Sequence, residues 1–173
     1  MANAPVIDDL LQLRFDDAPQ NVPDAPDAGL WQTIANHQSC RSYTDAPLDP
    51  DLVRHLCALA LCSPTKSDLQ QRDIIIVDDP DKRATINALF PDSKWIADAP
   101  VFLVFCGNNR RLRQIHARHG HPFENDHLDA FFNAAVDAGI ALSAFVLAAD
   151  AAGLGTCPIS TVRDHLETMN ELL

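Results

Sequence analysis

The pattern of apolar and polar positions predicts a mixed α and β domain. Apolar residues at helical spacing predict a helix that begins at Pro50, after an N-terminal cap at Asp49, and ends near Ser63. Unbroken β-branched and apolar runs predict two buried strands, over 73–77 and 101–106. Capping and spacing signals predict further helices over 30–36, over 79–89, and from Ser160 or Thr161 to the C-terminus.

The longest predicted helix runs from about His127 to Ala152, and Asp126 is expected to cap its start. Apolar residues occupy every side of this helix, so we expect it to be buried. Small residues recur along it and permit close contact with another helix, in the core or at a subunit interface. The glycines of 153–155 are expected to end it.

The remaining segments predict loops and an arm. Residues 1–28 are rich in Asp, Ala and Pro and predict a flexible acidic arm with one helical turn, which precedes a domain over 29–173. Residues 91–98 and 108–125 predict polar surface segments. Two strands do not make a stable sheet. Either the extended segments near Tyr43 and Cys157 join it, or part of the sheet lies outside this chain.

Composition narrows the classes of partner and the compartment. The 173 residues suffice for one domain with a core, and a net charge of -11 disfavours nucleic acid and anionic membranes as partners. Five cysteines in no regular pattern indicate free thiols in a reducing compartment; Cys57, Cys62 and Cys106 are expected to lie in the core. The chain shows no secretory signal, and its longest apolar run, over about 138–149, is too short to span a bilayer. We therefore expect a cytoplasmic protein.

One short segment, over 37–43, concentrates cations and hydrogen-bond donors in this acidic chain. Arg41 offers a planar fork of donors, and His37 is a switchable cation. Such a set can hold a phosphate group. Polar loops over 63–71 and 153–160 could converge on the same ligand, although caps and turns explain each loop separately as well. The other polar side chains of the first segment are those of Gln38, Ser39 and Ser42.

The order of these motifs resembles that of the flavin-dependent nitroreductase superfamily, and most closely its NADPH-using nitroreductase and flavin reductase subgroup. The motifs are HQSCR at 37–41, SPTKSDLQ at 63–70, and GLG followed by TCPIS at 153–160. The resemblance covers about residues 30–173. It implies an α+β fold, with helices around a central mixed sheet and a long buried central helix, and a homodimer when complete.

The resemblance also implies that FMN is the cofactor and that NADPH or NADH is the electron donor. Asp68 stands where many relatives have Asn, and a carboxylate cannot donate to a flavin carbonyl unless it is protonated. Family members continue beyond the position of Leu173, so we expect a C-terminally truncated chain. The implied FMN-binding residues are His37, Gln38, Ser39, Arg41, Thr65, Asp68, Ser93, Pro158, Ile159, Ser160 and Thr161.

The implied reaction passes hydride from the nicotinamide through flavin N5 to a nitroaromatic, quinone or flavin acceptor. The cofactor carries this chemistry, so no catalytic side chain is expected. Two alternatives remain open. One is a non-catalytic flavin-binding or interaction protein on the same fold, favoured by Asp68, by Ser160 and by the missing C-terminal part. The other is a helix-rich interaction domain whose loops are unrelated to flavin.

A histidine-rich stretch is a second candidate for a functional site, in this case a metal site. No Cys pair or helical metal-binding motif frames its histidines, so we expect no metal site and a solvated loop near the nicotinamide entrance. Neighbouring arginines could steer a nicotinamide dinucleotide phosphate, or could simply balance local acids. The residues concerned are His116, His119, His121, Arg110, Arg111 and Arg113.

Overall fold

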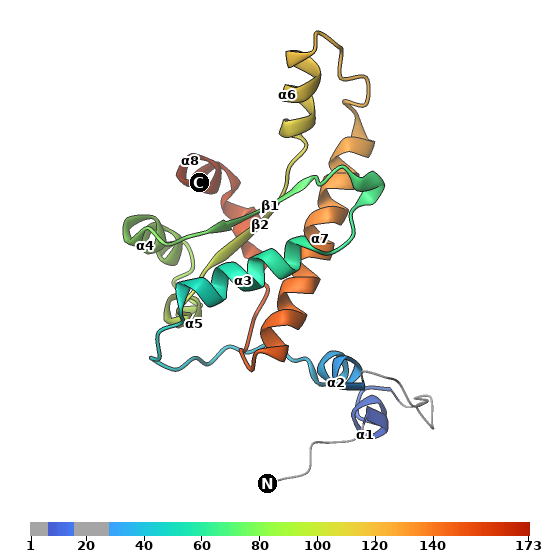
Figure 1. Ribbon diagram of the computed structural model, residues 1–173. Helices are drawn as coiled ribbons and strands as arrows, with labels where there is room; N and C mark the ends of the chain where they lie inside the picture. Colours follow the sequence, from blue (N-terminus) through green and yellow to red (C-terminus); the bar gives the residue numbers. More distant parts are fainter. Residues whose placement is uncertain (1–6, 16–27) are drawn as a thin grey trace.

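A long helix and a small sheet organise the molecule. The computed structural model describes residues 7–15 and 28–173, and in Figure 1 the helix α7 (Leu128–Ala151) forms its spine. The strands β1 (Arg72–Ile76) and β2 (Leu103–Gly107) pair antiparallel, with Ile74 opposite Phe105. They are the whole sheet of the described residues, and both predicted strands are confirmed within two residues.

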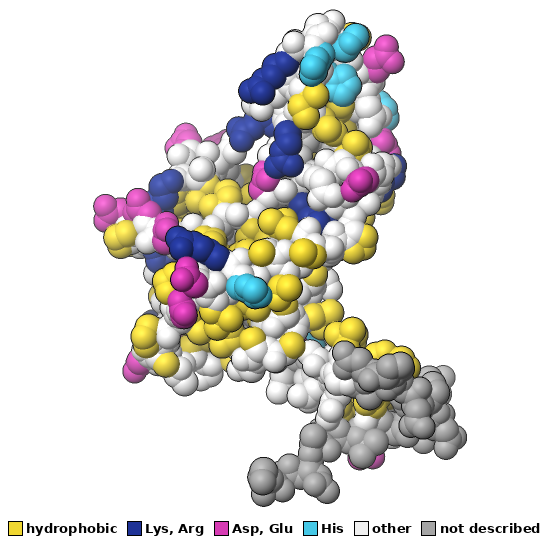
Figure 2. Space-filling view, in the orientation of Figure 1, with side chains coloured by type: hydrophobic (Ala, Val, Ile, Leu, Met, Phe, Trp, Pro, Cys, Tyr) yellow, Lys and Arg dark blue, Asp and Glu magenta, His cyan; other side chains and the backbone are white. Residues whose placement is uncertain are grey.

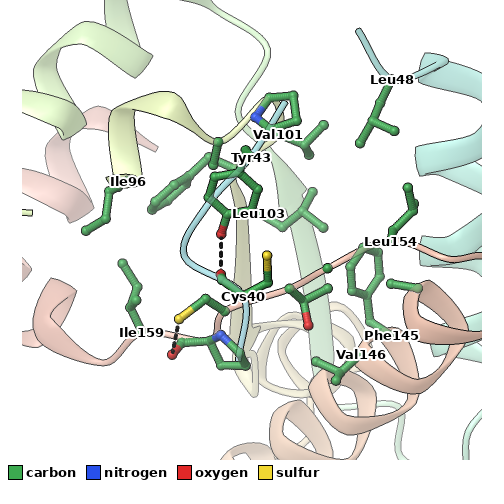
Figure 3. Close-up of a pocket in the computed structure, with 18 of the residues that line it drawn as sticks. Cys40, Tyr43, Leu48, Ile96, Val101, Leu103, Phe145, Val146, Leu154 and Ile159 are labelled. Carbon is green, nitrogen blue, oxygen red and sulfur yellow. Dashed lines mark hydrogen bonds between the residues drawn. The ribbon is translucent and has the colours of Figure 1, made fainter. Parts of the chain in front are cut away.

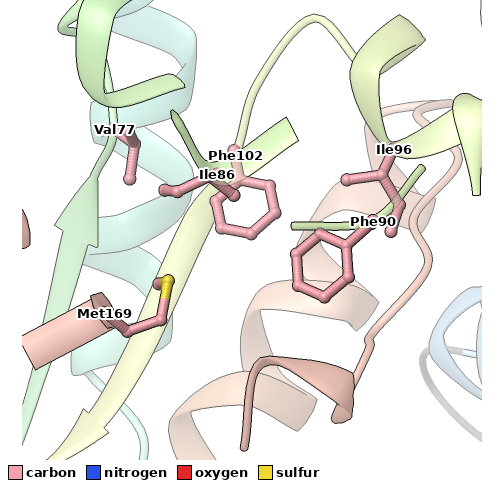
Figure 4. Packing of buried hydrophobic residues seen from close by; sticks show 6 residues of the cluster. All are labelled: Val77, Ile86, Phe90, Ile96, Phe102 and Met169. Carbon is pink, nitrogen blue, oxygen red and sulfur yellow. The ribbon is translucent and has the colours of Figure 1, made fainter. Parts of the chain in front are cut away.

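The side chains of β2 alternate between two packing layers, as a strand requires. Phe105 meets Phe145 of α7 edge to face, with ring centroids 5.6 Å apart. Phe102 and Val104 pack instead into an apolar cluster on the other side, shown in Figure 4. The sheet therefore has a covered face on each side. The buried members of the cluster are Val77, Ile86, Phe90, Ile96, Phe102 and Met169.

Two Asp-Pro pairs begin helices, as predicted. The Asp49 carboxylate accepts from the backbone N–H of Asp51 at 2.9 Å and starts α3 (Pro50–Leu61). Asp79 does the same for α4 (Pro80–Ala88). Proline fits the first helical position because its fixed φ is helical and the N–H that it lacks would have no partner there.

The two cysteines of the α3 region, Cys57 and Cys62, differ in exposure. Cys57 is buried as expected, whereas Cys62 follows the last turn of α3 and is exposed, so the prediction that it lies in the core is wrong. Cys106 is half-buried on β2.

Two segments expected to be irregular are helical. Residues Lys94–Asp98 form the short helix α5, and Arg110–Arg118 form α6, which projects from the rest of the molecule (Figure 1). Basic and histidine side chains gather at this projecting end, as Figure 2 shows. The ring of Phe123 holds the projection together, because it packs edge to face on His116 and lies beneath the guanidinium of Arg113.

The start and the surface of α7 differ from the prediction. His127, rather than Asp126, caps the helix by accepting from the backbone N–H of Asp129, while Asp126 pairs with Arg113. Burial on every side is also wrong, because Leu128, Phe131 and Phe132 are 77%, 68% and 62% exposed. Among the described helices, α7 has the length and apolar composition that could cross a membrane, and part of its surface is buried against the protein.

The chain ends are helical where they are described. Within the predicted arm, residues 1–6 and 16–27 lie outside the described residues. The helix α1 (Ile7–Gln12) packs on α2 (Ala28–Asn36) and buries Leu10. The C-terminal part forms a 3₁₀ turn (Thr161–His165) followed by α8 (Leu166–Leu172), without the side-chain cap expected from Ser160 or Thr161.

Candidate functional site

The basic segment 37–43 lies beside the loop that follows α7. The backbone N–H of Cys40 donates to the carbonyl of Thr156 at 2.8 Å. A Cβ placed on Gly155 would lie 2.6 Å from the Cβ of Cys40, so only glycine allows this approach. Two of the three predicted ligand-binding loops are therefore adjacent. Of the two alternatives for the sheet, the joining of these extended segments does not occur in the described residues, since they hydrogen-bond to each other.

The basic segment has two sides. Cys40 and Ser42 line a cavity of about 540 Å³, shown in Figure 3, whereas His37, Ser39 and Arg41 do not. Predicted phosphate ligands thus point away from the cavity, and Arg41 lies over the ring of Trp95 with its guanidinium carbon 5.8 Å from the ring centroid. Gln38, Ser39 and Arg41 are exposed and available to a ligand.

The cavity itself is largely apolar. Side chains of β2, α7 and the 153–159 loop line it, including Leu103, Phe145 and the predicted Pro158 and Ile159. Tyr43 closes one side, where its hydroxyl donates to the carbonyl of Cys40 at 2.9 Å. Burial raises the pKa of this phenol, and the nearby Cys157 and Cys40 raise it further. The cavity offers apolar contact rather than the charges that a phosphate needs.

Two buried charged residues hold the third loop, 63–71. Asp137 of α7 is fully buried, and its carboxylate accepts from the backbone N–H groups of Lys66 at 2.7 Å and Gln71 at 3.0 Å. The guanidinium of Arg72 donates to three backbone carbonyls, those of Leu61, Ser63 and Pro64, at 2.7–3.0 Å. A buried charge is tolerated only with such partners.

The conformation of this loop is strained. Ser67, Asp68 and Gln70 have φ of 56°, 54° and 53°, a region that costs non-glycine residues free energy. The side-chain amide of Gln70 donates to Asp68 at 2.9 Å, so this implied FMN-binding residue already accepts a hydrogen bond. Gln70 therefore places a side-chain amide beside Asp68. Gln70 is not among the predicted contact residues, although it closes the motif at 63–70. The hydroxyl of Thr65 is buried without a hydrogen-bond partner among the described residues.

The third loop lies far from the other two along α7. It contacts the helix at Asp137, whereas the basic segment contacts it at Asp150. These positions are 13 residues apart (150 − 137), which at 1.5 Å per residue is about 20 Å. One protomer therefore gathers two of the three predicted loops and leaves the third apart.

The remaining predicted residues lie at helix starts. Ser93 precedes α5, two residues before Trp95, and makes no side-chain capping bond there. The hydroxyl of Ser160 lies 3.4 Å from Arg163 in the turn that begins at Thr161. Ser160 is exposed, as is Thr161.

In the described part of the chain, no group of three potential metal ligands gathers, in the histidine-rich stretch or elsewhere. Arg111 pairs with Asp73 at 2.6 Å, and Arg113 pairs with Asp126. For these two arginines, the alternative that they balance local acidic residues is confirmed. The backbone N–H of Arg110 donates to the side-chain oxygen of Asn108, and its guanidinium has no hydrogen-bond or ion-pair partner in the described residues.

The donor set fits the phosphate end of a flavin nucleotide. Arg41 provides a planar cation, and the hydroxyl of Ser39 and the amide of Gln38 are exposed beside it. The Thr156 hydroxyl, one residue from the close contact at Gly155, is buried and lacks a partner in the described residues. Unsatisfied buried groups of this kind call for a ligand or water.

Comparison with known proteins gives one consistent result. Residues 34–173 match the nitroreductase family. The FMN reductase [NAD(P)H] of Bacillus subtilis (strain 168) is 35% identical over 144 residues, which are 82% of this chain and 58% of that protein. The NADPH-flavin oxidoreductase of Vibrio harveyi is 30% identical with the same coverage. The chain thus spans 58% of the length of these relatives.

The solved structures agree. A nitroreductase from B. subtilis superposes with a TM-score of 0.78 at 30% identity, over 83% of this chain and 59% of that chain.

Proposed function

Because the chain belongs to the nitroreductase family, we propose that it is the flavin-binding part of an FMN-dependent oxidoreductase. In this proposal hydride passes from NADPH or NADH to a small-molecule acceptor, such as a nitroaromatic compound, a quinone or free flavin. One observation carries it: all the predicted contact residues lie within the matched range, 34–173. FMN, when bound, would supply the hydride chemistry.

The chain's own residues would bind and orient the cofactor. His37, Ser39 and Arg41 would hold the phosphate, since the side that they share faces away from the apolar cavity. Pro158 and Ile159 would provide an apolar surface for the ring. Thr65 and Gln70 would approach the ring edge from the strained loop. The other proposed contacts of the cofactor, to which we assign no particular part of the flavin, are Gln38, Asp68, Ser93, Ser160 and Thr161.

We further infer that the complete site needs two copies of the chain. The strained loop and the basic segment contact α7 at points about 20 Å apart along the helix, and this separation supports a site shared between two protomers. Both sit on the helix whose apolar side chains remain exposed at its first turns. A homodimer would cover those side chains and bring one protomer's loop to the other's basic segment.

The binding site of the nicotinamide electron donor and the cellular compartment of the protein are also proposals. Arg110 on the projecting α6 is free to attract the phosphates of a nicotinamide dinucleotide. The protein would work in the cytoplasm, as its free thiols suggest. Residues 29–173 would form the flavin-binding domain and residues 1–28 an appended arm. The family match, which begins at residue 34, supports that division.

An absorbance spectrum tests the proposal. Purified protein is incubated with excess FMN, desalted, and reduced with NADPH under nitrogen. We expect flavin bands to be retained and then to bleach. The variant Arg41→Ala should retain less flavin, by about tenfold or more in affinity, because a charged hydrogen bond is worth about 1.5–3 kcal/mol. Arg54→Ala, on the exposed face of α3, is the control.

Two negative results of this experiment would have different meanings. Bound flavin that NADPH and NADH do not bleach would favour a non-catalytic binding protein on this fold. Absence of retained flavin, with the chain folded, would contradict the proposal.

A further inference from the structure

His37 lies where three parts of the chain meet. Its backbone N–H ends α2 by donating to Ile34, and its ring Nδ1 lies 2.7 Å from the carboxylate of Asp150 on α7. Arg14, which follows α1, donates to the carbonyls of Ala35 and His37. Both backbone and ring of His37 are therefore held in place before any ligand arrives.

Asp150 occupies a position where a carboxylate alone is unfavourable. It lies in the last turn of α7, at the negative end of the helix dipole, and that turn contains no basic residue. Its side chain is 17% exposed, and its hydrogen-bond partner among the described residues is His37. The 2.7 Å contact with the His37 ring gives this carboxylate a hydrogen-bond donor at the helix end.

The pairing fixes the proton on one ring nitrogen. A carboxylate accepts hydrogen bonds and does not donate, so the proton between the two residues sits on Nδ1 of His37. The opposite nitrogen, Nε2, has no partner in the described residues, and the side chain is 30% exposed. A phosphate also only accepts, so its contact with Nε2 requires the imidazolium with both nitrogens protonated.

We propose that Asp150 is a positioning residue of the phosphate site, which orients His37 so that its Nε2–H donates to the 5′-phosphate of the flavin nucleotide. This inference rests on the proposed function. Three charged groups belong to the surroundings of His37: Asp150 from α7, Arg14 at its backbone carbonyl, and Arg41 four residues further along the same segment. Of these, Asp150 contacts the ring itself.

A purely structural role is the competing explanation, because the same ion pair ties α2 to α7. The two roles differ in what they do to flavins with and without a phosphate. Loss of a tether would weaken FMN and riboflavin alike. Loss of the positioning would weaken FMN only, since riboflavin has no phosphate for His37 to contact.

The test compares dissociation constants for FMN and riboflavin in the variants Asp150→Asn and His37→Gln. We expect Asp150→Asn to weaken FMN by about 10- to 100-fold, the value of one charged hydrogen bond, and riboflavin by less than about twofold. The double variant should bind FMN no more weakly than His37→Gln alone, because the two residues act as one unit. Asp98→Asn, at the exposed end of α5, is the control.

A measurement on the unchanged protein guards against variants that fail to fold. Nitrogen-15 spectra of histidine-labelled protein should show both ring nitrogens of His37 protonated when FMN is bound at pH 7.5, and riboflavin should not produce this state. Equal weakening of both flavins, or a neutral His37 ring in the FMN complex, would overturn the positioning role. If the unchanged protein bound neither flavin, the proposed function would fail, and this inference with it.

Discussion

Individual thiols illustrate how burial sets the chemistry of a residue. Burial raises the pKa of Cys57 and that of Cys106, to which Asp73 contributes as well, whereas Cys62 is exposed. A raised pKa in the folded state favours the neutral thiol. Its contribution to stability is complete below the pKa of the unfolded thiol, near 8.5, and is lost as the pH rises through the folded value.

We therefore predict an alkaline loss of stability that depends on Cys57. Urea unfolding at pH 7 and pH 10 should show a smaller loss of stability at pH 10 for Cys57→Ala than for the unchanged chain, while Cys62→Ala should leave the pH dependence as it was. A thiol reagent should label Cys62 quickly at neutral pH and Cys57 only on unfolding. Equal labelling rates would contradict this.

For single residues, the sequence indicated which side chains could bind a ligand but not which residues they contact in the fold. The segment around Arg41 was identified from its donors, and those side chains are exposed as a ligand site needs. The partnership of His37 with Asp150 spans 113 positions, and no local pattern encodes it. Asp137 did leave a signal, as an acid within an apolar helix. A buried acid of this kind requires donors, but not particular ones.

The strained loop shows how one element fixes another. Asp137 holds both ends of the 66–71 turn by accepting from two backbone N–H groups. Three residues of this turn have a left-handed φ. The contacts that overcome this strain come from α7 and from Arg72, so the loop is shaped from outside rather than by its own sequence.

Asp137→Asn should consequently lower the free energy of unfolding by about 1–3 kcal/mol, because its amide group would face a backbone N–H that now lacks an acceptor. Urea titration at pH 7 measures the loss, and amide exchange at Lys66 and Gln71 should accelerate. Asp51→Asn, on the exposed face of α3, should change stability by less than about 0.5 kcal/mol. Similar effects of both substitutions would disprove the role given to Asp137.

Elements with strong local signals were predicted well. Asp49 and Asp79 placed the starts of α3 and α4, because a cap and a proline at the first position act locally. The helix α6 was missed because its arginines and histidines leave few apolar positions. It is held by Phe123, which lies outside it. For α7, apolar residues on all sides gave no indication of which face the protein covers.

On the scale of the whole molecule, the first turns of α7 remain uncovered. Leu128, Phe131 and Phe132 lie at the helix end that also carries the strained loop. The proposed homodimer predicts that Phe132→Glu yields a monomer, because a charge would be buried against the partner. Sedimentation equilibrium measures this, with Leu166→Glu on the equally exposed α8 position as a control that stays dimeric. A monomeric unchanged chain would contradict the proposed assembly.

The fold class was predicted from the sequence, but the relative positions of the loops were not. The α+β fold and the two strands are confirmed, and the expected shortage of strands is present as a two-stranded sheet among the described residues. Sequence spacing could not show that the loops occupy two regions of one long helix, since that arrangement follows from the packing of α7 against the sheet and α3.

The stacking of Arg41 over Trp95 has an optical consequence. The chain has two tryptophans, and the other, Trp31, lies exposed on α2. In Trp31→Phe, all indole emission would come from Trp95, beside the segment proposed to hold the phosphate. Flavin absorbs where indole emits, so energy transfer would quench that emission on binding. The protein therefore carries its own fluorescent reporter of cofactor occupancy.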